Sequence, residues 1–132
     1  MTNIKEALLK TNIFIHNTYF EKYIKLIENN KDSVYTKYIS QRHHIIPRFY
    51  LRVSKQIVED NLVILTYGEH VLAHYYLLNC VKDEFYKSAK TACLRLNQPN
   101  LTVDFVENNV CNLNKWYYNI MSTAYKNRKK KV

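Results

Sequence analysis

Residues 61–79 read NLVILTYGEHVLAHYYLLN, and this stretch predicts a short strand that leads directly into a helix. Its first five residues, NLVIL, are mostly apolar, which is typical of a buried strand. Thr66 and Glu69 then fit the S/T-x-x-E capping box, which places Thr66 at the N-cap and Glu69 at the third helical position. With this frame fixed, His70 falls in the first turn of the helix and His74 falls one turn later.

The residues before this stretch predict a second strand. Residues 43–53, HHIIPRFYLRV, are rich in β-branched and aromatic side chains but contain Pro47, so we expect an edge strand or a strand that soon breaks. Paired with the strand at 61–65, it makes a hairpin whose loop of about ten residues is long by usual standards. The hairpin and the helix that follows it occupy about residues 41–79.

Helices are expected on both sides of this unit. N-terminal helices are predicted within 4–30, with Asn17 or Thr18 as an N-cap, and C-terminal helices at 83–97 and 102–130. The inner face of the last helical stretch is expected to carry Phe105, Val110, Leu113, Trp116, Tyr117 and Ile120. Residues 1–132 are therefore predicted to form one mainly helical domain of the α+β class, built around the hairpin–helix core.

The composition limits the classes of partner. The chain carries 20 Lys and Arg residues against 11 Asp and Glu residues, a formal net charge of +9, which favours an acidic partner such as nucleic acid or an anionic membrane. No apolar run of about 18 residues is present, so a membrane-spanning helix is not expected. The three cysteines form no CxxC motif, and the N-terminus lacks a signal-peptide pattern, which together favour a cytoplasmic protein.

Four of the five histidines lie within 32 residues, at positions 43, 44, 70 and 74. The pair His70 and His74 has the i,i+4 spacing that lets two imidazoles on one helical face share a cation. The zinc-protease motif is excluded, because it needs Glu directly after the first histidine and Val71 occupies that position. A hairpin before the helix would close a metal site between this pair and either His43 or His44. Neighbouring strand residues point to opposite faces, so the two histidines of the doublet are expected to act differently.

These features together resemble a known family. The doublet His43-His44 precedes Ile-Ile-Pro-Arg, Asn61 opens the second strand, His70 follows nine residues later and His74 four residues after that. This ordered set resembles the HNH, or ββα-metal, endonuclease family of the type common in bacteriophages and mobile elements. The resemblance covers about residues 41–79 and implies a metal-dependent endonuclease or nickase that hydrolyses DNA phosphodiester bonds.

The resemblance also implies roles for the motif residues. His43 would be a metal ligand and His44 the general base that takes a proton from water. Asn61 is the family's middle motif residue, which usually braces the hairpin loop through hydrogen bonds. His70 would be a metal ligand, and His74 resembles the additional ligand of colicin-type members. One divalent cation held by His43, His70 and His74 would stabilise the negative charge that develops at the phosphate.

The identity of that cation is open at this point, and the chain departs from the family pattern in two ways. Family resemblance implies Mg²⁺ or Mn²⁺, whereas an all-imidazole ligand set prefers Zn²⁺, Ni²⁺ or another transition metal. Many members have Asp in place of His43, and some lack the equivalent of His74. The Gly-Gly turn often found after Pro-Arg is replaced by residues 49–52, Phe-Tyr-Leu-Arg, which leaves the shape of the hairpin loop open.

Basic residues near the motif and at the C-terminus are the candidate DNA contacts. Arg42 and Arg48 flank the doublet, and the C-terminal candidates are Lys126, Arg128, Lys129, Lys130 and Lys131. A solvated surface position is the alternative for each of them. The alternative function is a non-catalytic DNA-binding module with a structural zinc in a ββα fold. The sequence leaves open whether the protein is a monomer or a homodimer, which target it recognises, and whether it serves homing, packaging, restriction or toxicity.

Overall fold

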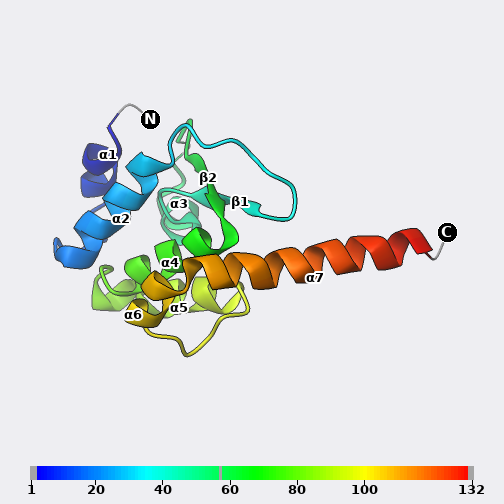
Figure 1. The fold of residues 1–132 in the computed structure, drawn as a ribbon. Helices are drawn as coiled ribbons and strands as arrows, with labels where there is room; N and C mark the ends of the chain where they lie inside the picture. The colour runs from blue at the N-terminus through cyan, green and yellow to red at the C-terminus, as the bar shows by residue number, and fades with distance from the viewer. Residues whose placement is uncertain (1–2, 57, 131–132) are drawn as a thin grey trace.

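The computed structural model describes residues 3–56 and 58–130 and shows a mainly helical α+β chain, which confirms the predicted class (Figure 1). β1 and β2 form a two-stranded antiparallel sheet. In chain order, the elements are α1 Ile4–Thr11, α2 Thr18–Asn29, β1 Ser40–His44, α3 Arg48–Ser54, β2 Leu62–Thr66, α4 Tyr67–Leu78, the 3₁₀ helix η1 Asp83–Phe85, α5 Tyr86–Leu94, α6 Val103–Asn108 and α7 Val110–Lys130.

The helix α4 lies at the centre of the molecule and contacts α2, α5, α6, α7 and both strands. Most of its residues are buried, namely Tyr67, Gly68, Val71, Leu72, Ala73, Tyr75, Tyr76 and Leu77. A helix that is apolar on nearly every side is stable only in the interior, where other elements cover it. The same core cluster includes residues from α1, α2, β2, α5, α6 and α7.

The start of α4 is set by local hydrogen bonds, as the sequence predicted. The hydroxyl of Thr66 accepts a hydrogen bond from the backbone N–H of Glu69, and the Glu69 carboxylate accepts one from the backbone N–H of Thr66. The predicted cap of the second helix is also confirmed, because Asn17 accepts a hydrogen bond from the backbone N–H of Phe20. Each cap pairs a backbone donor that the first turn leaves unpaired.

The two strands are registered so that His43 faces Val63 and His44 faces Leu62. Of the two alternatives predicted for residues 43–53, the structure shows the strand that soon breaks: β1 ends at His44 and α3 follows at Arg48–Ser54. Pro47 stands at the N-cap of α3 with φ −55° and has no N–H to donate to a sheet. The strand therefore ends before Pro47, and its β-branched and aromatic residues enter a short helix instead.

The C-terminal helices are divided more finely than the sequence predicted. The stretch 83–97 forms η1 and α5, and the stretch 102–130 is interrupted at Asn109, between α6 and α7. The Asn109 side chain donates a hydrogen bond to the backbone carbonyl of Phe105. Asparagine side chains compete in this way with regular backbone pairing, which favours a break between helices.

The helix α7 is held close to α4 at Gly68, the chain's one glycine. A Cβ at this position would overlap the carbonyl oxygen of Val110, so only glycine permits the approach. The backbone N–H of Gly68 donates to Oδ1 of Asn114 at 2.6 Å. One turn on, the ring of Tyr117 stacks on Tyr67 with centroids 4.5 Å apart.

Beyond this contact, α7 extends away from the body of the molecule (Figure 1). The predicted inner face is therefore only partly buried. Leu113 belongs to the core, whereas Trp116 and Ile120 are 42% and 45% exposed and Phe105, on α6, is 48% exposed. The prediction of a buried face is wrong for these three residues, because the packing of α6 and α7 leaves more than two fifths of each side chain exposed. No helix in the described part of the chain is long and apolar enough to cross a membrane.

Candidate metal centre

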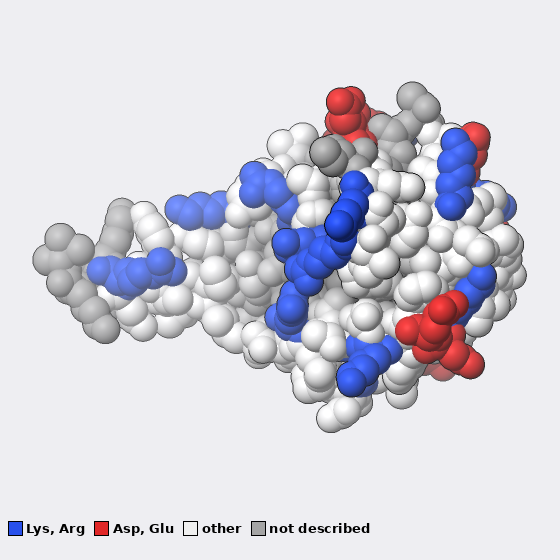
Figure 2. All heavy atoms as spheres, turned by 180° about the vertical axis from the view of Figure 1, so that it is seen from behind, with Lys and Arg blue, Asp and Glu red and all other residues white. Residues whose placement is uncertain are grey.

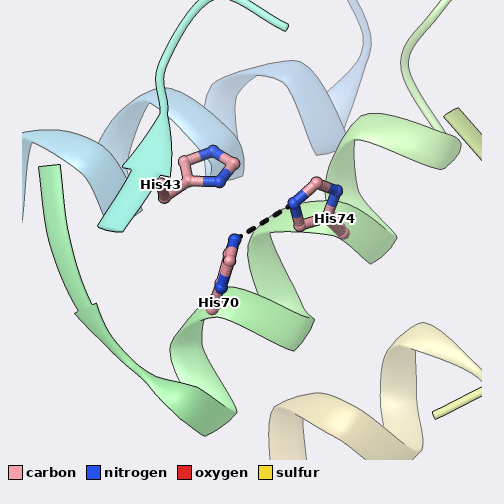
Figure 3. A group of neighbouring side chains, drawn as sticks. All are labelled: His43, His70 and His74. Carbon is pink, nitrogen blue, oxygen red and sulfur yellow. Dashed lines mark hydrogen bonds between the residues drawn. The ribbon is translucent and has the colours of Figure 1, made fainter. Parts of the chain in front are cut away.

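Three histidines from two elements converge on one point. His43 lies on β1, and His70 and His74 lie one turn apart on α4 (Figure 3). Each offers one ring nitrogen, and these three atoms lie within 4.8 Å of one another. The ring centroids are 4.9 to 5.1 Å apart. Such spacing allows one cation to be bound by all three imidazoles, and it groups His43, not His44, with the helical pair.

Two local structures place these rings. The capping box fixes the first turn of α4, so His70 and His74 project from the same helical face. The antiparallel register turns His43 inward, where it is 1% exposed, while Arg42 on the opposite face of β1 is exposed. Of the two adjacent histidines on the strand, His43 therefore faces the helical pair.

Hydrogen bonds determine which nitrogen His43 presents. The Tyr23 hydroxyl on α2 donates to the backbone carbonyl of Ile45 at 2.7 Å, which occupies its only proton. The contact of 2.7 Å between that hydroxyl oxygen and Nε2 of His43 is therefore donated by the imidazole. Nδ1 of His43 then carries a free lone pair, and it is buried with no hydrogen-bond partner. A buried acceptor without a partner is costly unless a ligand completes it.

His70 is oriented in a similar way by a residue of the strand. Its Nδ1 lies 2.6 Å from Oε1 of Gln41, an amide oxygen that can only accept, so Nδ1 carries the proton. Nε2 of His70 is then unprotonated and lies 3.2 Å from Nε2 of His74 (Figure 3). Metal-binding histidines commonly donate their second ring N–H to an oxygen in this manner, which fixes both the tautomer and the ring orientation.

Burial keeps all three imidazoles neutral. Desolvation, followed by the neighbouring histidines, lowers the pKa of His43 well below its ordinary value. Burial lowers the pKa of His70 to about 3 and that of His74 to about 4, with smaller contributions from nearby histidines. The neutral form is the one that ligates a metal, so the cluster is ready to bind at neutral pH without releasing protons from imidazolium.

The donor set fits a divalent transition metal. The cluster consists of three imidazoles, and no carboxylate belongs to it among the described residues. Imidazole nitrogen suits Zn²⁺, Ni²⁺ and related ions, whereas Mg²⁺ requires oxygen ligands. The orphaned lone pair of His43 and the two fixed tautomers are what such an ion would need. Three protein ligands also leave a coordination position free, as in catalytic zinc sites.

A cleft of about 400 Å³ opens beside the cluster. It contains His43, His70 and His74, and its walls include the two arginines predicted from the sequence, Arg42 and Arg48. Two further arginines, Arg52 and Arg95, also line it, and none of the described lining residues is acidic. Four guanidinium groups around one cleft make it a site for anions. A band of Lys and Arg side chains also crosses the middle of the face shown in Figure 2, with the acidic side chains outside it.

His44 lines the same cleft but does not belong to the three-histidine cluster. Its pKa is lowered from the ordinary value by desolvation and then by the positive charge of Arg48. A lowered pKa keeps the imidazole able to accept a proton at neutral pH. The doublet is thus divided as the alternation of a strand requires, with His43 in the cluster and His44 on the wall of the cleft.

Asn61 is occupied in holding the loop between the strands. Its side-chain oxygen accepts a hydrogen bond from the backbone N–H of Ile46 at 2.7 Å, and its amide donates to the carbonyl of Ile46 at 3.0 Å. Asn61 is buried, at 6% exposure, and lies outside the residues that line the cleft. These hydrogen bonds agree with the bracing role that the resemblance implies for this position.

The basic C-terminal residues lie elsewhere. Lys126 and Arg128 are exposed near the end of α7, which Figure 1 shows far from the hairpin. Lys129 and Lys130 belong to the described backbone of α7 but their side chains do not, and Lys131 lies outside the described residues. The structure therefore brings Arg42 and Arg48 to the histidine cluster and leaves Lys126 and Arg128 at a distance from it.

Four residues of this region were missed in the sequence: Tyr23, Gln41, Arg52 and Arg95. Gln41 could have been found, since it lies two residues before His43 and so on the same face of the strand. Arg52 lies one helical turn after Arg48, a spacing that has meaning only once the segment is known to be helical. Tyr23 and Arg95 carry no local signal, because their positions depend on the packing of α2 and α5.

Comparison with known proteins adds no identification. No family model matches the chain, and no curated protein or solved structure matches it either. We therefore infer the function from the geometry of this site and from the motif in the sequence.

Proposed function

We propose that this protein is a metal-dependent endonuclease or nickase of the HNH type that hydrolyses DNA phosphodiester bonds. The observation that carries the proposal is the convergence of His43, His70 and His74 beside an arginine-lined cleft that also contains His44. A cation site, a neutral base and an anion-binding wall are the three components that phosphodiester hydrolysis requires.

The open side of the cluster favours catalysis over a purely structural site. Structural zinc sites are usually closed by four protein ligands. Here the cluster has three, and His70 and His74 both line the cleft. A free coordination position that faces an anion-binding cleft is the arrangement in which a substrate oxygen reaches the metal.

Each component has a defined part in the proposed reaction. His43, His70 and His74 would hold a divalent cation, which would supply positive charge to stabilise the transition state and the departing 3′ oxygen. Arg42 and Arg48 bind the phosphate oxygens and hold the strand in position. Neutral His44 accepts a proton from the attacking water, and the charge on Arg48 opposes protonation of His44 before the substrate arrives.

We infer that the working ion is a first-row transition metal such as Zn²⁺ or Ni²⁺. The imidazole donors support this inference, since Mg²⁺ binds nitrogen ligands poorly. The assignment to the HNH family of phages and mobile elements is supported by the motif spacing together with the hairpin–helix arrangement. The partner is accordingly DNA, and the net charge of +9 agrees with a polyanionic substrate.

A plasmid assay tests the proposal. Supercoiled plasmid is incubated with wild type and Mg²⁺, Mn²⁺, Ni²⁺ or Zn²⁺, beside the variants His44→Ala, His43→Ala and His16→Ala. His16 is exposed and lies outside the cluster, so it is the matched control. We expect nicked or linear plasmid with wild type and the control. Loss of the general base is expected to slow cleavage by about 10²–10⁴-fold.

Metal binding by the same variants separates the two histidines of the doublet. Isothermal titration with Zn²⁺ is expected to show binding to wild type and His44→Ala but strongly weakened binding to His43→Ala. Intact plasmid under all four metals, combined with normal zinc binding, would instead support the non-catalytic DNA-binding module with a structural zinc. Equal loss of zinc affinity in His43→Ala and His44→Ala would contradict the proposed division of roles.

A further inference from the structure

We propose that the cleft beside the histidine cluster accepts a single strand of DNA, with one unpaired nucleotide lying between α3 and α5. This inference rests on the proposed nuclease function and specifies the form of its substrate. A double helix would be cut only where one strand can leave it, at an end, a nick, a branch or a transiently opened pair.

The walls of the cleft come from elements on two sides of the cluster. One wall is α3, which contributes Arg48, Phe49 and Arg52. The other is α5 with the residues that follow it, which contribute Ser88, Ala89, Thr91, Ala92, Arg95 and Leu96. The histidines of β1 and α4 line the same cleft, so a scissile phosphate bound in it lies beside the cluster.

The size of the cleft is suited to one nucleotide. A volume of about 400 Å³ lies at the lower end of the range of about 300–1,000 Å³ that is typical of small-ligand pockets. Proteins that read a duplex insert a protruding helix or ribbon into a groove about 12 Å wide. Enzymes that act inside a pocket of this kind take the target nucleotide out of the stack.

The chemistry of the lining also matches a single strand. Single-strand binding proteins combine a positively charged groove with aromatic surfaces on which unpaired bases stack. The cleft has arginines on both walls, and the ring of Phe49 is held against Phe85 with centroids 6.0 Å apart. The small side chains of Ala89 and Ala92 line the same cleft as Phe49 and leave room for the flat face of a base. We assign the neighbouring phosphate to Arg52 and Arg95.

Binding without cleavage tests the inference directly. In a His44→Ala background with Zn²⁺, fluorescence anisotropy compares a labelled single-stranded oligonucleotide with its blunt duplex over a series of salt concentrations. We expect the single strand to bind at least about tenfold more tightly. Adding Arg95→Gln is expected to weaken single-strand binding by about tenfold and to lower the salt slope by about one.

Two further variants complete the design. Lys25→Gln removes the same charge from an exposed position on α2 outside the cleft, and it is the control for Arg95→Gln. Ala92→Phe fills the α5 wall and is expected to abolish the preference for the single strand. Thermal unfolding followed by circular dichroism shows whether Ala92→Phe is folded. If it is not, the comparison of Arg95→Gln with Lys25→Gln still tests the inference.

The outcomes distinguish this inference from the proposed function. Equal or tighter binding of the duplex, or identical effects of Arg95→Gln and Lys25→Gln, overturns the single-strand inference. A protein that binds the single strand as expected but cuts neither form with any metal overturns the nuclease proposal alone. Preferred cleavage of an intact blunt duplex supports the nuclease proposal and overturns the inference.

Discussion

The histidine centre and the outer part of α7 are held in the molecule in different ways. His43 is 1% exposed and is bound by Tyr23 from α2, and His70 is bound by Gln41 from β1. By contrast, α7 packs on α4 near its start and then extends away from the body, where Tyr118 and Tyr125 contact the ring of Tyr38 and Trp116 is 42% exposed (Figure 1). One region has its side-chain geometry fixed by several elements, while the other depends on a few contacts.

This contrast separates two kinds of contribution to the proposed DNA binding and cleavage. Chemistry requires atoms held at defined positions, which burial and hydrogen bonding supply at the cluster. Contact with the DNA backbone requires only positive charge within reach, which an extended helix with exposed basic residues can supply. The following predictions test whether the two regions behave as differently as their surroundings suggest.

Lowering the pH is expected to change the free energy of unfolding more than any other perturbation considered, and we attribute this change to the buried histidines of the cluster. In metal-free protein the pKa values of His70 and His74 are lowered to about 3 and about 4, so the unfolded chain binds more protons below about pH 6.5. The neutral imidazoles therefore make their full contribution to stability above that pH. This contribution is lost as the pH falls towards the pKa values of the folded state. Urea unfolding in EDTA between pH 7.5 and 4.5 should show the free energy of unfolding falling by several kcal/mol.

The variant His70→Gln identifies the source of this slope. Removing one buried histidine should reduce the pH dependence by up to about 1.4 kcal/mol per pH unit. An unchanged slope in the variant would show that acid acts at other groups. Truncating the end of α7 is expected to leave the slope unaltered.

Substitution of Gly68 should separate α7 from the rest of the molecule. A Cβ there overlaps the carbonyl oxygen of Val110, so Gly68→Ala must push the two helices apart. We expect a loss of about 1–3 kcal/mol in the free energy of unfolding, as for other overpacked sites. Chemical denaturation measures it, and Ala73→Gly on the same helix controls for helix propensity.

If the two regions are independent, Gly68→Ala should retain zinc binding once folded. A parallel loss of zinc affinity and of stability would mean that the packing of α7 also sets the geometry of the cluster.

Loss of the Tyr23 hydroxyl should affect the metal more than the fold. Tyr23→Phe removes the acceptor that fixes Nε2 of His43, and such supporting contacts typically contribute 10–100-fold to metal affinity, or about 1.4–2.7 kcal/mol. Zinc titration measures the loss. Tyr19→Phe is the control, because Tyr19 is only partly buried and lies outside the cluster.

The smallest effect on stability is expected from the C-terminal basic residues. Deleting residues 126–132 should change the free energy of unfolding by less than about 0.5 kcal/mol, since the described side chains there are exposed. DNA binding should weaken uniformly across sequences, with a flatter dependence on salt. Because the deletion removes five positive charges, the matched comparison is Lys126→Gln with Arg128→Gln against Lys10→Gln with Lys25→Gln, which removes two charges inside and two outside this tail. A salt slope identical to wild type would argue against contact between this tail and phosphate.

The prediction from sequence succeeded where local rules govern structure and failed where packing overrides them. The capping box at Thr66 placed His70 and His74, and the alternation of the strand indicated that His43 and His44 would act differently, because both rules depend on near neighbours. The choice of His43 as the ligand came from the family resemblance. The break near Pro47 was among the predicted alternatives, but the helix α3 that follows was not predicted, since the aromatic and β-branched residues there favour strands. This strand preference is overridden when a proline interrupts the backbone hydrogen bonds of the sheet.

The sequence by itself determined the α+β class, the start of α4 and the one-turn spacing of its two histidines. Those features follow from short-range hydrogen bonds and from the periods of helix and strand. Only the tertiary structure decided that Tyr23 fixes His43, that α5 closes the cleft with Arg95, and that α7 extends into solvent. These arrangements join residues far apart in the chain, and no local pattern encodes which helices pack together.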